Sequence, residues 1–335
     1  MDVDMTLDSR LDRAAEAARS GEEAGYDAVW TAEVGNDPFL PLALAAAATE
    51  RVTLGTSIAV AFARSPMTMA QIAWDLNQLS NGRFVLGLGS QIKPHITKRY
   101  SMPWSDPAAR MKELIEAMHA IWHTWSTGDK LDFRGDYYTH TIMTPMFTPR
   151  QREAGAPKVF LAGVGPLMTR VAGEVADGFL AHGFTTAEFL RDVTLPKLAE
   201  GRERSGRDDK IEVALPGFVV TGATEEEMAA NAKLTKERIA FYGSTPAYKP
   251  VLDHHGWGDL QPELNAMSKR GEWEAMGTII DDDVLDGFAV VAEPDQLGTK
   301  LVERYAGLVD RLSFYVPAAL PAETVASTLA QIKAA

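Results

Sequence analysis

The sequence predicts an α/β barrel of eight parallel strands, each followed by a helix, in one domain that spans residues 1–335. Strand-like and helix-like segments alternate along the chain, a pattern typical of a parallel sheet covered by helices. The expected strands also number eight, as in a closed (β/α)8 barrel. They are expected at residues 3–5, 28–31, 52–60, 84–88, 159–162, 178–181, 212–220 and 311–316.

The third expected strand, residues 52–60, is the clearest. Its β-branched and apolar residues suit a strand that is buried on both faces, as in a parallel sheet. Pro66 and the spacing of the apolar residues after it predict a helix directly behind the strand. The strand, its loop and this helix therefore make one β/α unit, and barrels of this kind hold their chemistry in such loops.

Two stretches interrupt the repeat. Residues 133–140 form a small excursion before the fifth strand, and residues 244–286 form a long connection between the seventh and eighth units. A connection of this length is more often a functional lid than a plain linker. We therefore expect an insertion or lid at 244–286 within the single domain.

The composition restricts the possible partners. With 46% hydrophobic and 24% charged residues, the chain can build a large globular core. A net charge of −13 argues against nucleic acid or an anionic membrane as a partner, and no apolar run is long enough to span a bilayer. The lack of cysteine and of a basic-then-apolar leading segment favours the cytoplasm. The expected partner is a small-molecule substrate.

A glycine-rich turn, Gly163-Val164-Gly165-Pro166, lies between the fifth strand and a helix expected to begin near Pro166. Its backbone N–H groups could bind a phosphate, whereas the alternative interpretation is a tight turn chosen for packing. A doubly wound dinucleotide fold is excluded. Neither this turn nor Gly87-Leu88-Gly89 has the third glycine and the later acidic residue that its phosphate turn requires.

Two of the seven histidines follow expected strands. His95 comes after the fourth strand and His182 after the sixth, so both are candidates for a proton donor at the catalytic end of the barrel. His254 and His255, with the acidic run 281–283, could instead hold a metal in a barrel hydrolase. Neighbouring loop residues rarely converge on a metal without a third ligand at fixed spacing, so no metal is expected.

Three segments follow one another at a recognisable spacing: AGYDAVWTAE at 24–33, NGRFVLGLGS at 81–90 and AGEVADG at 172–178. In their order and spacing they resemble the luciferase-like oxidoreductases, (β/α)8 barrels that use FMN or the deazaflavin coenzyme F420. The resemblance covers nearly the whole chain. Thr56-Ser57-Ile58 and the segment Gln91-Ile92-Lys93-Pro94-His95-Ile96 are most similar to the deazaflavin-dependent branch of actinobacteria.

The resemblance implies a cofactor site. It implies that Glu33 lies near the cofactor ring, that the Ser57–Ile58 peptide bond is cis and meets the ring, and that the glycine turn binds the phosphate. The candidate catalytic residues are then Glu33, His95 and His182. The implied cofactor contacts are Thr56, Ser57, Ile58, Ala59, Ser90, Gln91, Ala162, Gly163, Val164 and Gly165.

Two positions depart from the deazaflavin-dependent sugar-phosphate dehydrogenases of this family, which have a histidine after the acid of strand two and a glutamate after strand four. This sequence has Val34 and Ile92 there, so a less charged substrate is expected. The resemblance implies a homodimer that transfers a hydride between F420 and a small organic substrate. The alternatives are an FMN-dependent monooxygenase that uses O2 and a partner reductase, a metal-assisted hydrolase, and a non-catalytic flavin-binding barrel.

Overall fold

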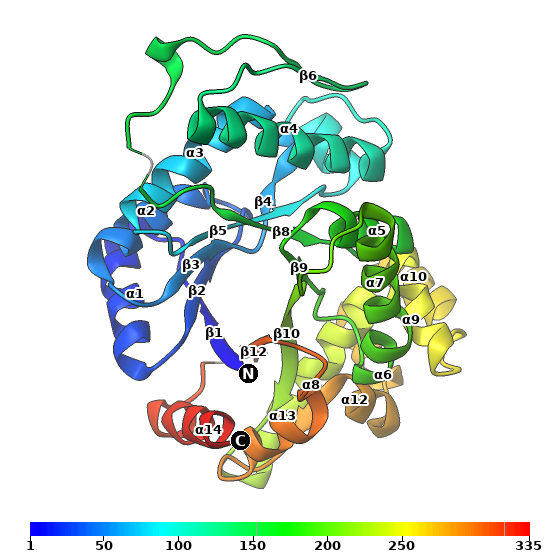
Figure 1. Cartoon of the computed structure of the whole chain (residues 1–335). Helices are drawn as coiled ribbons and strands as arrows, with labels where there is room; N and C mark the ends of the chain where they lie inside the picture. The colour runs from blue at the N-terminus through cyan, green and yellow to red at the C-terminus, as the bar shows by residue number, and fades with distance from the viewer. Residues whose placement is uncertain (152, 318) are drawn as a thin grey trace. The chain divides into compact units, whose positions relative to one another are not determined.

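The computed structural model describes residues 1–151, 153–317 and 319–335. Eight parallel strands close into a (β/α)8 barrel, as the alternation of segments predicts (Figure 1). The barrel strands follow one another in chain order. They are β1 (Asp2–Thr6), β2 (Ala28–Thr31), β3 (Thr53–Thr56) continued by β4 (Ala59–Val60), β5 (Phe84–Gly89), β8 (Lys158–Ala162), β9 (Gly178–Leu180), β10 (Glu212–Val220) and β12 (Arg311–Tyr315).

The predicted strand 52–60 is wrong in one respect, because it is not continuous. The pairing of β3 with β5 ends at Gly55 and Val85, and β4 resumes it at Ala59 and Leu88. Ser57 and Ile58 leave the ladder between these two points. The strands predicted at 178–181 and 311–316 each end one residue early.

Two strand pairings were not predicted, one in the barrel sheet and one in a separate two-stranded sheet. A short strand, β11 (Ala289–Val291), pairs with the carboxyl half of β10. The excursion at 133–140 is an antiparallel hairpin of β6 (Phe133–Arg134) and β7 (Thr139–His140).

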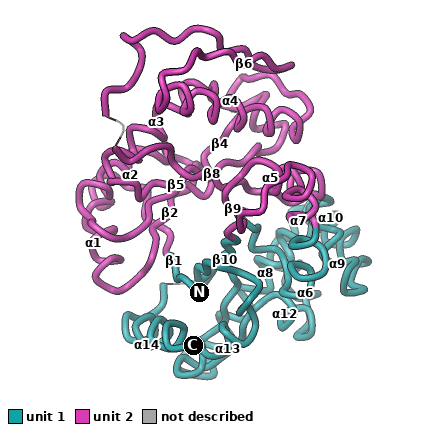
Figure 2. Tube along the Cα trace, in the orientation of Figure 1, with its two compact units in different colours: residues 1–4, 181–196, 213–335 teal, residues 5–180, 197–212 magenta. Residues whose placement is uncertain are grey.

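The chain divides into two compact units (Figure 2). The amino-terminal unit contains residues 5–180 and 197–212, and the carboxy-terminal unit contains residues 1–4, 181–196 and 213–335. In the described part of the chain, every helix is too short or too polar to cross a bilayer.

In the amino-terminal unit, aromatic side chains of the sheet lie over glycines of the next strand. Trp30 pairs with Gly55, and Phe160 pairs with Gly178. A Cβ on either glycine would fall within 2.5 Å of the aromatic ring, so only glycine leaves room for these large side chains. The helices of this unit are α1 (Leu11–Ala24), α2 (Phe39–Ala48), η1 (Ala61–Ala63), α3 (Pro66–Leu79), η2 (His95–Arg99), α4 (Pro107–Thr127), η3 (Pro145–Phe147), α5 (Pro166–Val175) and most of α7 (Leu195–Ser205).

In the carboxy-terminal unit, the connection 244–286 folds as a series of short helices. Buried residues of this connection, among them Leu252, Leu264 and Met276, share one hydrophobic cluster with Phe184 and Phe218. Its action as a lid stays a prediction. The helices of this unit are α6 (Ala187–Phe189), η4 (Leu190–Thr194), α8 (Glu225–Gly243), η5 (Pro246–Tyr248), α9 (Lys249–His254), α10 (Leu260–Arg270), α11 (Trp273–Met276), η6 (Gly277–Ile279), α12 (Asp282–Phe288), α13 (Leu297–Tyr305) and α14 (Ala322–Ala334).

Candidate active site

The carboxyl ends of β2, β3, β5 and β8 lie along one edge of the amino-terminal unit, because these neighbouring strands are all parallel. Barrel enzymes hold their active sites at this end of the strands. The loops that follow these strands contain Glu33, Ser57, Gln91 and Gly163, so most of the residues implied by the resemblance share this edge.

The Ser57–Ile58 peptide bond is cis, which confirms what the resemblance implies. Both of its residues are hydrogen-bonded to the end of β2. The amide of Ser57 donates to the carbonyl oxygen of Thr31 at 2.6 Å, and the carbonyl oxygen of Ile58 accepts from the amide of Glu33 at 3.1 Å. The loop between β3 and β4 is therefore held from the neighbouring strand.

The side chain of Ile58 packs over Gly89, the last residue of β5. A Cβ on Gly89 would lie 2.9 Å from both Cγ1 and Cδ1 of Ile58, closer than real contacts allow. Glycine therefore makes the room that Ile58 occupies. Ile58 is half-buried and Ser57 is exposed, so at the strand ends they form a surface with one apolar and one polar side chain, called the Ile58 shelf below.

The side chain of Thr56 replaces backbone hydrogen bonds where the pairing of β3 with β5 is interrupted. Its hydroxyl donates to the carbonyl oxygen of Gly87 at 2.7 Å and accepts from the amide of Gly87 at 2.9 Å. Thr56 is fully buried, so its side chain satisfies backbone groups that would otherwise be left unpaired. Contact of Thr56 with a cofactor stays a prediction.

Glu33 is the centre of a hydrogen-bond network behind the loop. Its Oε2 accepts from the amide of Val60 and from Nη1 of Arg64, both at 2.7 Å, and its Oε1 accepts from the hydroxyl of Tyr100 at 3.1 Å. Nη2 of Arg64 also reaches Asp37 at 3.2 Å. Burial and the nearby Glu33 charge raise the pKa of Tyr100, so its hydroxyl stays protonated and donates.

The sequence analysis missed Arg64 and Tyr100 as partners of Glu33. Arg64 was visible at the entry to α3, but its ion-pair partner lies 31 residues away and is set by the fold. Tyr100 carries no local signal at all, because only the tertiary structure brings it to Glu33. A catalytic role of Glu33 itself stays a prediction.

The glycine turn precedes α5, which begins at Pro166 as predicted. Gly165 is the residue that caps this helix, and it offers no side chain to the first-turn N–H groups. Its φ of −89° is ordinary, and an added Cβ would have open space around it. Gly165 is therefore not required by backbone conformation or packing, which favours the anion-binding interpretation over a turn chosen for packing.

The remaining implied contacts lie near these groups in the chain. Ser90 and Gln91 are half-buried after β5, and Gln91 has a left-handed φ of 56°. Ala59 is buried in β4, and Ala162 is half-buried at the end of β8. His95 is exposed at the start of η2. Their contact with a cofactor or substrate stays a prediction.

His182 belongs to the carboxy-terminal unit and follows β9. Its Nδ1 accepts from the amide of Phe184 at 3.0 Å, its ring stacks on Tyr248 at 4.7 Å, and the ring of Tyr242 meets it edge-on at 4.8 Å. Burial lowers the pKa of His182 to about 4. At neutral pH the ring is therefore uncharged, and the bond to Nδ1 assigns its proton to Nε2.

A tyrosine pair lies beside this histidine. The hydroxyls of Tyr242 and Tyr315 are 2.7 Å apart, and Nη1 of Arg238 donates to the Tyr315 hydroxyl at 2.7 Å. Burial raises the pKa of Tyr242 above its ordinary value and that of Tyr248 to about 12. Of these residues, only Tyr248 lies in the connection 244–286 that the sequence analysis singled out.

His254 and His255 have partners within the protein. Nε2 of His255 lies 2.8 Å from the hydroxyl of Thr186, and Nε2 of His254 lies 3.3 Å from Asp192. Asp281, the first of the acidic run, caps α12. Over the ranges that the structure describes, no three histidine, aspartate or glutamate side chains gather as a metal site would require.

Residues 2–311 match the model of the luciferase-like monooxygenase family, and the chain belongs to this family. An uncharacterized protein of Mycobacterium tuberculosis is 53% identical over 311 residues, 92% of each chain. An F420-dependent glucose-6-phosphate dehydrogenase of Nocardia farcinica is 34% identical over 201 residues, 56% of this chain and 57% of its own.

Among solved structures, the coenzyme F420-dependent tetrahydromethanopterin reductase of Methanopyrus kandleri has a similar fold, with a TM-score of 0.78 at 22% identity over 98% of this chain and 97% of its own. This likeness concerns the fold alone. Family membership and the named relatives together support an enzyme of the oxidoreductase class.

Proposed function

We propose that this protein transfers a hydride between coenzyme F420 and a small organic substrate. The observation that carries the proposal is the Ile58 shelf, which Glu33 and Gly89 hold at the strand ends of the same unit that contains the turn before α5. A relative that is named as F420-dependent supports the deazaflavin over FMN. The homodimer that the resemblance implies and the cytoplasmic location that the composition favours are part of the same proposal.

The residues of the shelf fit a flat, partly apolar ring. The branched side chain of Ile58 is half-buried, and Ser57 beside it is small and exposed. Three hydrogen bonds fix the backbone on both sides of the shelf: the amide of Ser57 donates to the carbonyl oxygen of Thr31, the amide of Glu33 donates to that of Ile58, and the amide of Val60 donates to the Glu33 carboxylate. A ring that binds there would meet a surface that is already ordered, which lowers the entropy cost of binding.

The turn before α5 fits a phosphate. An uncapped helix N-terminus presents N–H groups and the positive end of the helix dipole to an anion. Gly165 leaves the approach to these groups open, and Pro166 at the first position has no N–H to leave unpaired. Gly163, Val164 and Gly165 would therefore hold the phosphate through their backbone.

When bound, F420 supplies the carbon that gives or accepts the hydride. The chain therefore has to bind and orient the cofactor and the substrate, and to exclude water from them. Val34 and Ile92, in the loops after β2 and β5, are 71% and 58% exposed. Apolar side chains at these two positions favour a weakly charged substrate. His182 stays the candidate for proton transfer from the sequence, and its neutral ring could donate a hydrogen bond to the substrate through Nε2; with a pKa of about 4 it holds no imidazolium proton to release at neutral pH.

A turnover assay tests the proposal. The purified protein is mixed anaerobically with reduced F420 and a panel of uncharged ketones, enones and quinones, and reoxidation of the cofactor is followed by its absorbance. We expect protein-dependent reoxidation with at least one acceptor. Consumption of O2 with reduced FMN, and no reoxidation of F420 by any acceptor, would instead support the FMN-dependent monooxygenase.

A further inference from the structure

Five polar side chains of the carboxy-terminal unit form one group, called the tyrosine cluster below. They are His182 after β9, Arg238 and Tyr242 in α8, Tyr248 in η5 and Tyr315 at the end of β12. The ring centre of Tyr242 lies 4.8 Å from that of His182, 6.1 Å from that of Tyr248 and 6.5 Å from that of Tyr315. Segments far apart in the chain therefore bring these groups together. Of the five, only His182 has a part in the function proposed above.

Arg238 is the charged member of the cluster, and it is exposed. Its Nη1 donates to the hydroxyl of Tyr315 at 2.7 Å, and its guanidinium lies over the ring of Tyr315, 5.2 Å from the ring centre. In the same helix, Lys236 forms an ion pair with Asp282 at 2.7 Å. Arg238 has no such carboxylate partner in the described ranges, so its positive charge is available to a ligand.

The hydroxyls of Tyr242 and Tyr315 hold one more proton than their own hydrogen bonds use. The two oxygens are 2.7 Å apart, so one of the two phenolic protons lies between them. Arg238 only donates and cannot accept the other proton. Burial and the hydrogen bond to Tyr315 raise the pKa of Tyr242, so this hydroxyl stays protonated. Since the pair has no further partner in the described part of the chain, one O–H remains free to donate.

His182 and Tyr248 provide two more donors, and their rings stack at 4.7 Å. Because Nδ1 of His182 accepts from the amide of Phe184, the ring proton is on Nε2. Within the described residues, neither this Nε2 nor the hydroxyl of Tyr248 has a hydrogen-bond partner. The described side-chain atoms that are buried without a partner do not include them. Both donors are therefore at the surface, where a ligand can reach them.

The tyrosine cluster thus presents hydrogen-bond donors and one positive charge. Burial is the cause that lowers the pKa of His182, whereas a nearby carboxylate would raise it. No carboxylate of the described residues therefore acts on this ring. Donors without matching acceptors favour a ligand that carries acceptor oxygens.

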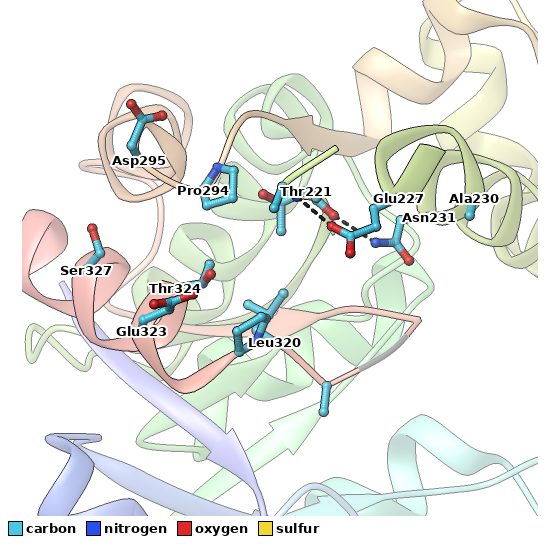
Figure 3. A pocket seen from close by; sticks show the side chains of 14 residues that line it. Thr221, Glu227, Ala230, Asn231, Pro294, Asp295, Leu320, Glu323, Thr324 and Ser327 are labelled. Atoms are coloured by element: carbon cyan, nitrogen blue, oxygen red, sulfur yellow. Dashed lines mark hydrogen bonds between the residues drawn. The ribbon is translucent and has the colours of Figure 1, made fainter. Parts of the chain in front are cut away.

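The pocket shown in Figure 3 offers a ligand the opposite chemistry. It has a volume of about 720 Å³, and the loops after β10, β11 and β12 contribute to its walls. The 14 described residues that line it include Glu227, Asp295 and Glu323, and no lysine, arginine or histidine. Carboxylates repel the acceptor oxygens of a ligand. A ligand rich in such oxygens therefore suits the tyrosine cluster and not this pocket.

The rings around the donors favour a flat ligand. Phe241 and Trp273 are 50% and 51% exposed, with ring centres 6.0 Å apart, and Phe241 lies 5.4 Å from Tyr242. Aromatic faces and edges of this kind attract another aromatic ring. The donors also come from separate elements, so they suit a ligand with acceptor oxygens at more than one point. A quinone combines a flat ring with two carbonyl oxygens.

We infer that the tyrosine cluster binds a quinone, and that a quinone is the substrate of the proposed hydride transfer. The carbonyl oxygens accept hydrogen bonds from Nε2 of His182, from the hydroxyl of Tyr248 and from the free O–H of the tyrosine pair. The role as substrate rests on the proposed function. In that reaction both electrons arrive with the hydride of reduced F420, and a proton from water completes the hydroquinone. Binding of the quinone itself needs no cofactor.

Calorimetric titration of the full chain with menadione, without F420, tests the inference. The chain has no cysteine, so the quinone has no thiol to alkylate. We expect saturable binding of one menadione per chain. The hydrocarbon 2-methylnaphthalene has the same ring system without the oxygens, and it should bind at least tenfold more weakly.

Two sets of variants test the donors. The double variant Tyr248→Phe, Tyr315→Phe keeps both rings and removes two hydroxyls, so it should fold normally and bind menadione at least tenfold more weakly. Its control, Tyr137→Phe, removes a hydroxyl that is bonded to Asp106 in the other unit and should bind menadione unchanged.

Arg238→Gln should weaken menadione binding about threefold, because the variant loses the positive charge beside the acceptor oxygens. The exposed Lys300→Gln removes the same charge elsewhere in the unit and should have no effect.

The inference is overturned if menadione shows no saturable binding, if 2-methylnaphthalene binds as tightly, or if the double tyrosine variant binds menadione unchanged. Tighter binding of 2-naphthoate would overturn it in favour of a carboxylate site. Because F420 is absent from these titrations, failure of the proposed function is seen separately, in the turnover assay. Reoxidation of reduced F420 by ketones, without menadione binding, would contradict the quinone inference and leave the proposed function intact.

Discussion

The carboxylate of Glu33 accepts a 2.7 Å hydrogen bond from Nη1 of Arg64, and both side chains are largely buried, with exposed fractions of 7% and 16%. The same carboxylate oxygen accepts from the amide of Val60, just beyond the Ile58 shelf. The end of β2 thus holds the loop that follows β3. In this arrangement Glu33 acts as a positioning residue.

Replacing Glu33 by glutamine tests this positioning role. Glutamine leaves the guanidinium of Arg64 with a neutral partner, and removing one partner of a buried ion pair costs about 3–5 kcal/mol at most. We expect a lower melting temperature and an F420 affinity that falls about tenfold, because the shelf loses its anchor. Glu16→Gln, on the exposed face of α1, is the matched control and should change neither. A lower melting temperature with unchanged F420 affinity would show that the hydrogen bonds of Glu33 stabilise the fold but do not contribute to cofactor binding.

The residue that caps α5 allows a charge to be added without loss of stability. Asp and Asn are both favoured at such a position over Gly by a few tenths of a kcal/mol, and an added Cβ at Gly165 has open space. Gly165→Asp and Gly165→Asn should therefore unfold at or above the temperature of the unmodified protein. Only the aspartate repels a phosphate, so F420 should bind to it at least tenfold more weakly than to the asparagine variant. Equal affinities of the two variants would place the phosphate elsewhere.

The room that Gly89 gives to Ile58 makes a double-mutant test possible. In Gly89→Ala the new methyl group would lie 2.9 Å from Ile58, and overpacking of this kind costs about 1–3 kcal/mol. We expect lower stability and weaker F420 binding, since Ile58 must move. The further change Ile58→Ala removes the clash, so the free energy of unfolding of the double variant should exceed the additive expectation. Strict additivity in chemical denaturation would contradict the packing described here.

The uncharged state of His182 predicts a pH-dependent stability. Burial lowers its pKa from 6.5 to about 4, so between these values the unfolded chain binds more protons than the folded one. The contribution of the uncharged His182 ring to the free energy of unfolding is therefore fully present above pH 6.5, and it is lost as the pH falls towards 4. From pH 7 to pH 5 the loss is about 2 kcal/mol at most, since one pKa unit corresponds to about 1.4 kcal/mol.

The variant His182→Gln removes this titration while its amide oxygen can still accept from Phe184. We expect the free energy of unfolding of the variant to fall by about 1–2 kcal/mol less than that of the unmodified protein between pH 7 and pH 5. Urea unfolding at both pH values measures the difference. Equal losses in the two proteins would mean that His182 titrates normally in the fold.

Local patterns in the sequence predicted much of the fold. The strand Ala28–Thr31 has the predicted bounds, and helices begin at Pro66 and at Pro166 as predicted, because buried apolar runs and prolines at the first helical turn are local signals. The break in the run 52–60 was not visible, since β-branched residues favour a strand on both sides of it. It depends on Thr56 and Gly87, whose pairing only the fold creates.

The site was less predictable than the fold. The cis bond at Ser57–Ile58 followed from the family resemblance, and nothing in the periodicity of the chain indicates it. Tyr100 and Arg64 reach Glu33 through tertiary structure, and Tyr315 meets Tyr242 in the same way. Contacts between residues so far apart in the chain leave no pattern in a single sequence.

The central claim is that the Ile58 shelf and the turn before α5 bind a deazaflavin. Titration of the purified protein with oxidised F420 and, separately, with FMN, followed by the change in cofactor fluorescence, tests it most directly. The account predicts that F420 binds more tightly than FMN. Tighter binding of FMN, or yellow protein that carries FMN through purification, would contradict it.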